Sequence, residues 1–253
     1  MNYLPEQVKS EFDRDGYAFI PGFVDPHRIL EIDERMQRYI EEKVPLMPIT
    51  EVYYEDKNDP TTLKQLQKIF HYDPGFREIV QEQDFHDLAA LLMETDVFGR
   101  NLQYFNKPAR IGKPTPPHQD GYFFMLDPPA AVTMWLALDN VDAENGCVRY
   151  ISGSHKLGMR NHDRTQTLGF SQGIPDYGRD DELTLEKAFP ASPGDLLVHH
   201  ALTIHRADGN TSANRSRRAL GFVYFSEDAK EDLAAKDAYQ KKLDKELAEQ
   251  DKV

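Results

Sequence analysis

Apolar residues in the first hundred positions recur mostly three or four residues apart, which is the spacing of a helix with one buried face. The clearest stripe follows Asp25-Pro26, a pair typical of a helix start, and predicts an amphipathic helix over 26–43. Between residues 17 and 23 the chain instead resembles a short apolar strand that ends at Pro21-Gly22. Shorter helical patterns predict three further helices, at 5–15, at 63–70 (from Leu63, Leu66, Ile69 and Phe70) and at 85–95.

From about residue 100 the pattern changes to short β-rich runs separated by Gly, Pro and Asn turns. The predicted strands are Asn101–Phe105, Val132–Leu138, Cys147–Ile151, Asp195–His199 and Ala219–Phe225. Several short strands after a helical part predict an α+β fold, mainly β in its core, with a sandwich or barrel. Residues 157–190 look loop-like, and so long a loop in a compact domain is usually a lid or a binding loop. We expect a charged surface helix over 227–253, with docking to a partner as the alternative.

Composition narrows the classes of protein that fit. The 253 residues carry 40% hydrophobic and 29% charged side chains, which suits one domain over 1–253 with a sizeable core. A net charge of −13 disfavours binding to nucleic acid and to an anionic membrane surface. Cys147 is the single cysteine, so no intrachain disulfide can form and a reducing compartment is the simplest setting. The polar N-terminus is unlike a signal peptide, and we expect a cytoplasmic protein without a membrane span.

The first chemical motif is His118-Gln119-Asp120. Two residues apart on a strand, His118 and Asp120 would share one face, where an imidazole and a carboxylate can converge on one divalent metal. A third ligand would complete a two-histidine, one-carboxylate triad, which is typical of non-haem Fe(II) oxygenases. The candidates for it are His199, His200 and His205. Taken alone, a His near an Asp also fits a simple hydrogen-bonded pair.

The second motif is the arginine pair that opens the last predicted strand. Arg217 and Arg218 follow His205 by twelve and thirteen residues. A guanidinium group at the mouth of a barrel suits a carboxylate, because its planar fork binds one with two hydrogen bonds. Taken alone, Arg217 would equally fit a surface position or an ion pair.

Five segments in this order resemble the phytanoyl-CoA dioxygenase family. They are DGYAFIPGFVDP at 15–26, HQDGYFF at 118–124, TMWLALDNVDAENGCVRYISGSHK at 133–156, PGDLLVHHALTIHRADGNTS at 193–212 and RRALGFVY at 217–224. The resemblance implies a double-stranded β-helix (a jelly roll, or cupin-like fold) with flanking N-terminal helices. It divides the chain into a helical part at 1–98, a core at about 99–226 and a charged C-terminal helix at 227–253. It also implies the cofactor Fe(II), the cosubstrate 2-oxoglutarate and O₂.

The same resemblance assigns roles to residues of this chain. His118, Asp120 and His205 take the positions of the iron ligands, with His200 as the fallback for the third, and His199 and His200 are otherwise strand-end residues. Arg217 falls where the family binds the distal carboxylate of 2-oxoglutarate, although the spacing from His205 is one residue long and leaves Arg218 as a substitute. Further predicted cosubstrate contacts are Trp135, Gln103 and Thr133, the last of these (or Tyr104) replacing a Ser that some members carry at Ala207.

The implied reaction is hydroxylation of an aliphatic C–H bond, with release of succinate and CO₂. Related halogenases replace the ligand carboxylate by a small residue, so Asp120 favours hydroxylation. We expect a small polar or anionic metabolite as the substrate. The residues predicted to contact it are Tyr122, Arg149, Arg160 and Arg164, with a buried ion pair as the alternative for Arg149. Two other readings stay open: a non-catalytic binding module and a cupin-type metal enzyme with a different reaction. We expect a monomer or a homodimer.

Overall fold

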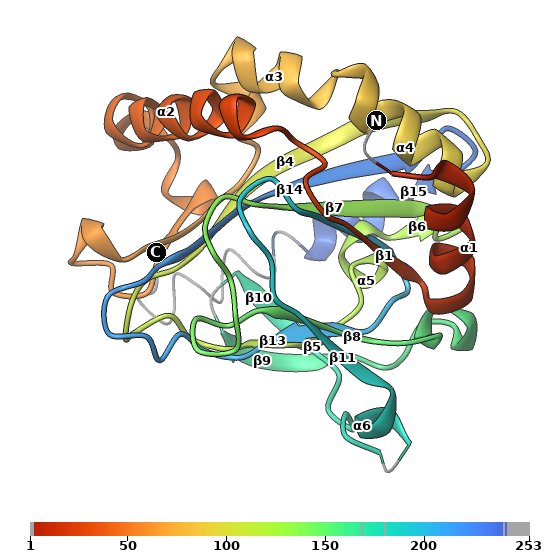
Figure 1. Ribbon diagram of the computed structural model, residues 1–253. Helices are drawn as coiled ribbons and strands as arrows, with labels where there is room; N and C mark the ends of the chain where they lie inside the picture. Colours follow the sequence, from red (N-terminus) through yellow and green to blue (C-terminus); the bar gives the residue numbers. More distant parts are fainter. Residues whose placement is uncertain (1–2, 168, 180, 240, 242–253) are drawn as a thin grey trace.

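Two antiparallel sheets lie at the centre of the computed structural model, which describes residues 3–167, 169–179, 181–239 and 241 (Figure 1). The larger sheet has seven strands and is drawn above the smaller one in Figure 1. Its strands, in spatial order, are β1 (Tyr17–Ile20), β12 (Leu196–His200), β7 (Ala131–Ala137), β14 (Arg217–Ser226), β4 (Val97–Lys107), β3 (Leu63–Leu66) and β2 (Val52–Tyr54).

The smaller sheet has four strands, and two further strand pairs lie at its side and at the edge of the fold. The four strands are, in spatial order, β11 (Glu186–Phe189), β8 (Val148–Ile151), β13 (His205–Ala207) and β5 (Thr115–His118). The pairs are β9 (Asp163–Thr167) with β10 (Phe170–Gly173), and β6 (Leu126–Asp127) with β15 (Lys230–Glu231). This α+β architecture with two facing sheets is the predicted jelly-roll class.

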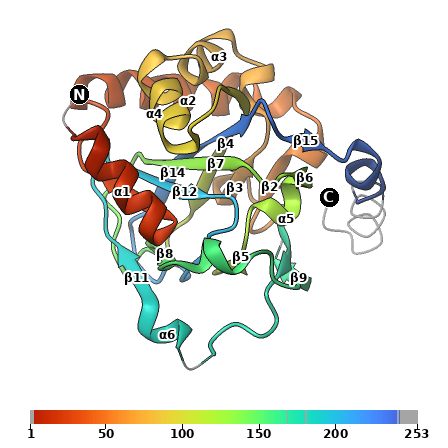
Figure 2. The same cartoon turned by 90° about the vertical axis from the view of Figure 1, so that its right-hand side faces the viewer.

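Three helices cover the outer face of the larger sheet, as Figures 1 and 2 both show: α2 (Pro26–Glu42), α3 (Pro74–Val80) and α4 (Gln83–Met93). Helix α1 (Pro5–Asp15) packs against the edge strand β1. The one-turn helices α5 (Gly121–Phe124) and α6 (Glu182–Leu185) lie elsewhere, the first directly after β5 and the second beside β8 of the smaller sheet. The predicted helix start at Asp25 is confirmed, since its carboxylate accepts hydrogen bonds from the backbone N–H groups of His27 and Arg28.

The alternation of side chains along the central strands separates the core from the site. Even-numbered residues of β7 and β14, such as Met134 and Leu220, pack with the helices in one hydrophobic cluster. Odd-numbered residues of the same strands, such as Trp135 and Ala219, belong to a second cluster between the two sheets. Because successive side chains of a strand point to opposite faces, each strand supplies both the core and the wall of an inner cavity.

The predicted helix at 63–70 is wrong. Residues 63–66 form β3, whose four side chains are all buried, and a short 3₁₀ turn follows at Ile69–His71. Lys68 between them has a φ of 55°, in the left-handed region, which interrupts any α-helix. The spacing of Leu63, Leu66 and Ile69 therefore reflects a strand and a separate turn.

Two other expectations need correction. Residues 157–190 are not one irregular loop, because they contain β9, β10, α6 and β11. Three of these strands pair within the segment or with β8, contacts that local periodicity does not reveal. The helix predicted over 227–253 begins later, since β15 precedes a helical run at 233–239. Residues 240 and 242–253 lie outside the described residues. The five strands predicted after residue 100 are confirmed within β4, β7, β8, β12 and β14.

Candidate metal centre and cosubstrate cavity

His118, Asp120 and His205 come together between the two sheets. β5 and β13 pair so that His118 lies directly opposite His205, and their ring centroids are 4.1 Å apart. Oδ1 of Asp120 lies 3.5 Å from Nε2 of His118 and 3.6 Å from Nε2 of His205. One potential ligand atom from each residue lies within 4.8 Å of the other two. The sequence predicted Asp120 on the same strand as His118. Asp120 instead lies in the turn that begins α5.

Backbone carbonyl groups orient both imidazoles. Nδ1 of His118 lies 2.8 Å from the oxygen of Pro116, and Nδ1 of His205 lies 3.0 Å from the oxygen of Thr203. A carbonyl oxygen only accepts, so each ring carries its proton on Nδ1 and directs the lone pair of Nε2 toward Asp120. Three electron-pair donors facing one another would repel, and a divalent cation between them removes that repulsion. This donor set fits Fe(II).

Burial controls the charge of these groups. It disfavours the imidazolium form and, together with the neighbouring His118 and His199, holds the pKa of His205 well below its usual value. Burial alone would raise the pKa of Asp120, but the surrounding imidazoles and the hydrogen bond from His199 hold that pKa well below its usual value. At neutral pH the site therefore presents a carboxylate and a neutral imidazole, the forms that bind metals.

Asp120 has two further partners on its other oxygen. Thr133 Oγ1 donates to Oδ2 of Asp120 over 2.6 Å, and Nε2 of His199 lies 3.1 Å from the same oxygen. Thr133, predicted as a cosubstrate contact, thus touches a candidate metal ligand. His199, one of the three sequence candidates for the third ligand, therefore lies in the site as a hydrogen-bond partner of Asp120. His200 points elsewhere, and its Nδ1 accepts the backbone N–H of Leu202.

Arg217 lies in the same cavity as the three candidate ligands, on the face of β14 that Ala219 also occupies. It is 4% exposed, and its Nε donates to the carbonyl oxygen of Gly146 over 3.2 Å. Its guanidinium carbon lies 5.4 Å from the ring centroid of Trp135, which also lines the cavity. Burial lowers the pKa of Arg217 to about 10, so the group stays charged at neutral pH. Among the described residues, no carboxylate pairs with it.

Arg218 faces the other way, toward the helices. Its guanidinium group pairs with Asp139 at 2.7 Å and with Asp33 of α2 at 2.5 Å. Successive side chains of a strand point to opposite faces, so only one of the two neighbouring arginines can face the cavity. That residue is Arg217. Tyr104 likewise lies on the helix side of β4, in the cluster that contains Leu102.

Two buried lysines in the cavity wall were missed at the level of sequence. Lys64 of β3 is 6% exposed, and its ammonium nitrogen has no hydrogen-bond partner among the described residues. That nitrogen lies 3.4 Å from Oε1 of Glu55, and burial lowers its pKa. Lys107 of β4 donates to Thr115 Oγ1 over 3.2 Å and to the carbonyl oxygen of Lys113. Burial and the neighbouring Arg217 place the pKa of Lys107 well below its usual value.

Gln103 contacts the cavity wall through a neighbour. Its Oε1 accepts from Nε2 of Gln65, which is one of the residues lining the cavity. The side chain of Gln65 comes from β3, the strand that the sequence interpreted as a helix. The role of Gln103 as a cosubstrate contact remains a prediction.

None of the four predicted substrate contacts is among the described residues that line this cavity. Tyr122 stacks on His162, with ring centroids 4.4 Å apart. Arg149 pairs with Asp208 at 2.8 Å and Glu186 at 3.2 Å, as in the alternative interpretation, and Arg160 pairs with Glu182 and Asp176. Arg164 lies on β9, opposite Gln172. Their contacts with a substrate remain predictions, as does a lid role for 157–190.

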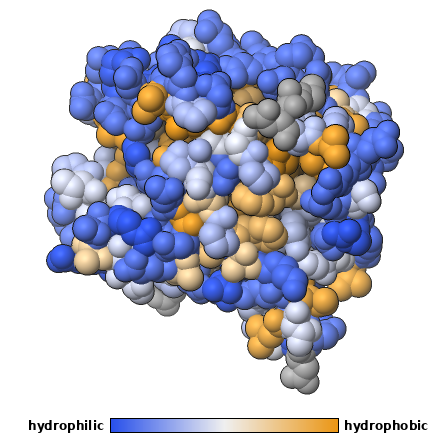
Figure 3. Space-filling view, in the orientation of Figure 1, coloured by the Kyte–Doolittle hydropathy of each residue, from blue (hydrophilic) through white to orange (hydrophobic). Residues whose placement is uncertain are grey.

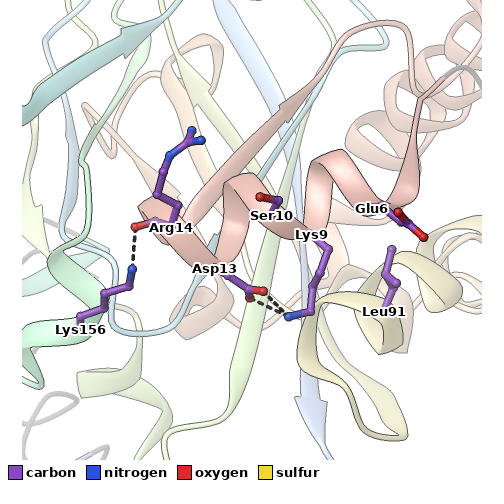
Figure 4. A pocket seen from close by; sticks show the side chains of 7 residues that line it. All are labelled: Glu6, Lys9, Ser10, Asp13, Arg14, Leu91 and Lys156. Carbon is purple, nitrogen blue, oxygen red and sulfur yellow. Dashed lines mark hydrogen bonds and ion pairs between the residues drawn. The ribbon is translucent and has the colours of Figure 1, made fainter.

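The face of the molecule shown in Figure 3 is hydrophilic around its edges. Apolar side chains gather in its centre, and a further group lies near α6, where Leu183 and Leu185 are exposed. A second hollow lies beside α1 (Figure 4). Its polar groups satisfy one another, since Lys9 pairs with Asp13 and Lys156 donates to the carbonyl oxygen of Arg14. It contains none of the predicted site residues.

A sequence profile of the phytanoyl-CoA dioxygenase (PhyH) family matches residues 12–219. The protein belongs to the phytanoyl-CoA dioxygenase family. The match covers the smaller sheet, the larger sheet up to the first residues of β14, the three candidate ligands and Arg217, and it confirms the resemblance seen in the sequence. As a family member the protein is a 2-oxoglutarate-dependent non-haem iron oxygenase, and its cofactor set is Fe(II), 2-oxoglutarate and O₂.

Individual relatives of this dioxygenase family are distant. The chain is 31% identical to the phytanoyl-CoA dioxygenase of Arabidopsis thaliana over 181 residues, which span 66% of this chain and 62% of the plant protein. An alignment of 274 positions with the peroxisomal phytanoyl-CoA dioxygenase of Rattus norvegicus has 27% identity and covers 98% of this chain and 76% of that protein.

Solved structures share the fold. The epimerase SnoN in complex with Fe³⁺, alpha ketoglutarate and nogalamycin RO aligns with a TM-score of 0.71 at 23% identity, covering 89% of this chain and 84% of that one. EctD from S. alaskensis with 2-oxoglutarate and 5-hydroxyectoine aligns with a TM-score of 0.72 at 17% identity, covering 89% and 78%. These likenesses establish the cupin-like architecture. Within the described residues, no helix combines the length and apolarity needed to cross a membrane.

Proposed function

We propose that this oxygenase hydroxylates an aliphatic C–H bond of a small anionic metabolite, with conversion of 2-oxoglutarate to succinate and CO₂. His118, Asp120 and His205 would hold Fe(II), and Arg217 would bind the distal carboxylate of 2-oxoglutarate. When bound, iron with the cosubstrate and O₂ supplies the oxidising power for this reaction. The observation that carries the proposal is the buried Arg217, which shares one cavity with the triad and has no carboxylate partner among the described residues.

The residues of the chain would divide the remaining work. Arg217 offers a planar fork to one carboxylate, and the ring of Trp135 beside it restricts where that carboxylate can lie. Lys64 would add a second cation. Its buried ammonium group lies 3.4 Å from Glu55 but makes no hydrogen bond among the described residues, so a ligand anion would complete its surroundings. The cavity is lined by strands of both sheets, and burial of these groups strengthens each of the charge interactions.

The anionic class of the substrate is supported by the balance of charge in the cavity wall. Four basic side chains line the cavity, Lys64, Lys107, Arg206 and Arg217, against the single carboxylate of Asp120. Arg206 is already paired with Glu186 and Asp208, and Lys64 lies 3.4 Å from Glu55. This leaves Lys107 and Arg217 as basic side chains of the wall that have no carboxylate partner among the described residues. Since the chain as a whole carries a net charge of −13, this local excess of positive charge favours anionic occupants.

A non-catalytic binding module is disfavoured because such a protein has no need to retain all three ligands and the arginine. A cupin-type enzyme without a cosubstrate would leave the buried charge of Arg217 uncompensated. We also propose that residues 1–253 act as one domain, since strands from 17–20 to 217–226 join the same sheet.

The test is an anaerobic titration of 2-oxoglutarate into the Fe(II)-loaded protein, followed by the visible metal-to-ligand charge-transfer band. We expect a saturable band that is greatly weakened in Arg217→Ala and preserved in the matched variant Arg218→Ala. Succinate formation with candidate carboxylates, phosphates and phosphonates would then identify the substrate. A band that never forms although iron binds would contradict the proposal and favour the cupin-type alternative.

A further inference from the structure

We propose that His199 is a positioning residue of the metal centre: together with Thr133 it binds one oxygen of Asp120, so that only the other oxygen is free for the metal. This inference rests on the proposed function of the triad as an iron site. The sequence offered His199 as one candidate for the third metal ligand, and the family resemblance made it a strand-end residue; neither gives it a positioning role.

The two oxygens of Asp120 have different surroundings. Oδ1 faces Nε2 of His118 at 3.5 Å and Nε2 of His205 at 3.6 Å. Oδ2 faces Thr133 Oγ1 at 2.6 Å and His199 Nε2 at 3.1 Å. Thr133 and His199 are directly opposite each other in the pairing of β7 with β12. One cross-strand pair of the larger sheet therefore provides both hydrogen-bond partners of Oδ2. The two histidines that face Oδ1 come from the smaller sheet.

The direction of each hydrogen bond follows from what the atoms can do. A carboxylate only accepts, so Nε2 of His199 carries the proton and donates to Oδ2. The hydroxyl group of Tyr150 lies 3.0 Å from Nδ1 of His199. Tyr150 is fully buried, and its hydroxyl proton needs an acceptor, which a neutral His199 offers at Nδ1. The chain therefore runs from Tyr150 O–H to Nδ1, and from Nε2–H to Asp120.

Tyr150 is itself fixed in place. Its ring stacks on that of Tyr17, with centroids 4.8 Å apart and planes 18° apart, and its strand pairs with β13 so that Tyr150 is opposite His205. A rigid tyrosine that donates to Nδ1 selects the tautomer of His199 that can donate from Nε2. His199 is 3% exposed, so water does not compete for either nitrogen.

This arrangement has a consequence for the number of open positions on a bound metal. A carboxylate can coordinate through one or both oxygens. Two hydrogen bonds occupy lone pairs of Oδ2 and hold the carboxylate plane, which favours coordination through Oδ1 alone. Neighbours that orient a metal ligand in this way typically change metal affinity by about 10- to 100-fold when they are removed. His199 is not a fourth ligand in this arrangement, since its Nε2 proton points at Asp120.

The experiment compares His199→Gln with His199→Asn in the full chain. The Gln amide can reach Asp120 in place of Nε2, whereas the shorter Asn amide reproduces Nδ1 and reaches only toward Tyr150. Both are polar and fill similar space. Anaerobic titration with Co²⁺ as the probe gives the dissociation constant and the visible d–d spectrum, which reports the coordination of the ion without any turnover. His200→Gln, on the opposite face of the same strand, is the matched control.

We expect H199N to weaken Co²⁺ binding by about 10- to 100-fold and to change the d–d spectrum, with H199Q and H200Q close to the wild type. Equal affinities and spectra for H199N and H199Q would overturn the inference while leaving the metal site intact. If H199N loses its structure by circular dichroism, Thr133→Val replaces it, since it removes the other donor to the same oxygen. A wild-type protein that binds no Co²⁺ would overturn both the proposed function and this inference.

Discussion

The guanidinium group of Arg217 lies over the ring of Trp135, and both side chains belong to the inner face of the larger sheet. The pairing of β14 with β7 places Gly221 opposite Trp135, and Arg217 lies four residues before Gly221 on the same face of β14. Arg217 approaches the ring along the same face without crossing the sheet. The ring of Trp135 therefore restricts the orientation of the Arg217 guanidinium group, which has no carboxylate partner among the described residues.

Arg217→Ala should raise the KM for 2-oxoglutarate by about 10- to 100-fold, because hydrogen bonds to a charged group in a buried site contribute about 1.5–3 kcal/mol. Arg218→Ala removes a partly exposed ion pair with Asp139 and should cost about 1 kcal/mol of unfolding free energy with little change in KM. Steady-state kinetics with 2-oxoglutarate as the varied substrate, beside thermal unfolding, separates the two. The opposite ranking of the KM values would contradict the assignment.

Lys64→Met should raise the KM for 2-oxoglutarate by about tenfold and lower the unfolding free energy of the cosubstrate-free protein by about 3–5 kcal/mol. The ammonium group lies 3.4 Å from Oε1 of Glu55 and both side chains are buried, so its removal leaves a buried carboxylate that retains the backbone N–H of Lys113 as a hydrogen-bond donor. The measurements are cosubstrate kinetics and a melting curve without cosubstrate.

Lys113→Met is the matched control, since its ammonium group lies 3.9 Å from the same Glu55 but is 63% exposed. It should leave the KM at the wild-type value. If the Lys64 variant also binds 2-oxoglutarate like the wild type, the second cation serves another purpose in the cavity.

The difference between Lys64 and Arg217 shows what sequence reasoning could reach. Arg217 lies in a segment that resembles a known family, so its role could be predicted from the sequence. The sequence could not show that Arg217, and not Arg218, faces the cavity. Lys64 lies in a segment with Leu63, Leu66 and Ile69 at helical spacing, and that spacing hid β3. The left-handed backbone at Lys68 that separates strand from turn has no signature in apolar periodicity.

The contact of His199 with Asp120 was not predicted for a related reason, although His199 was one of the candidates for the third ligand. In the pair His199-His200 the sequence does not say which imidazole points inward, because this depends on the register of β12 against β7. Register between strands some sixty residues apart is a property of the assembled sheets. The triad, in contrast, could be predicted because its three residues occupy motifs whose order the family resemblance preserves.

Replacing His118, Asp120 or His205 by Ala should abolish Fe(II)-dependent turnover and the rise in melting temperature on adding metal. A ligand that binds only the folded state stabilises it by about 2.7 kcal/mol at a concentration of 100 Kd. Wild-type protein should therefore melt higher with Co²⁺ than with a chelator, and the three variants should not respond. Far-UV circular dichroism checks that each variant is folded. A full metal response in any one of them would remove that residue from the ligand set.

His200 provides a pH-dependent contribution to stability that is separate from catalysis. Its ring lies 5.8 Å from that of His155 and 6.2 Å from that of Phe12, under α1. Burial, followed by the neighbouring His155 and His199, lowers the pKa of His200 to about 4. In the unfolded chain a histidine has a pKa of about 6.5. Between these two values the unfolded state binds the proton and the folded state does not.

The unfolding free energy of the wild type should therefore fall as the pH decreases from about 6.5 toward 4, because protons bind preferentially to the unfolded chain in that window. At pH 5 the titration of His200 lowers the unfolding free energy by about 2 kcal/mol, and above pH 7 it no longer changes it. His200→Gln removes the titrating group, so its unfolding free energy, measured by urea denaturation at pH 7 and pH 5, should fall by about 2 kcal/mol less than that of the wild type. Parallel losses in the two proteins would mean that His200 is protonated in the folded state as easily as in the unfolded one.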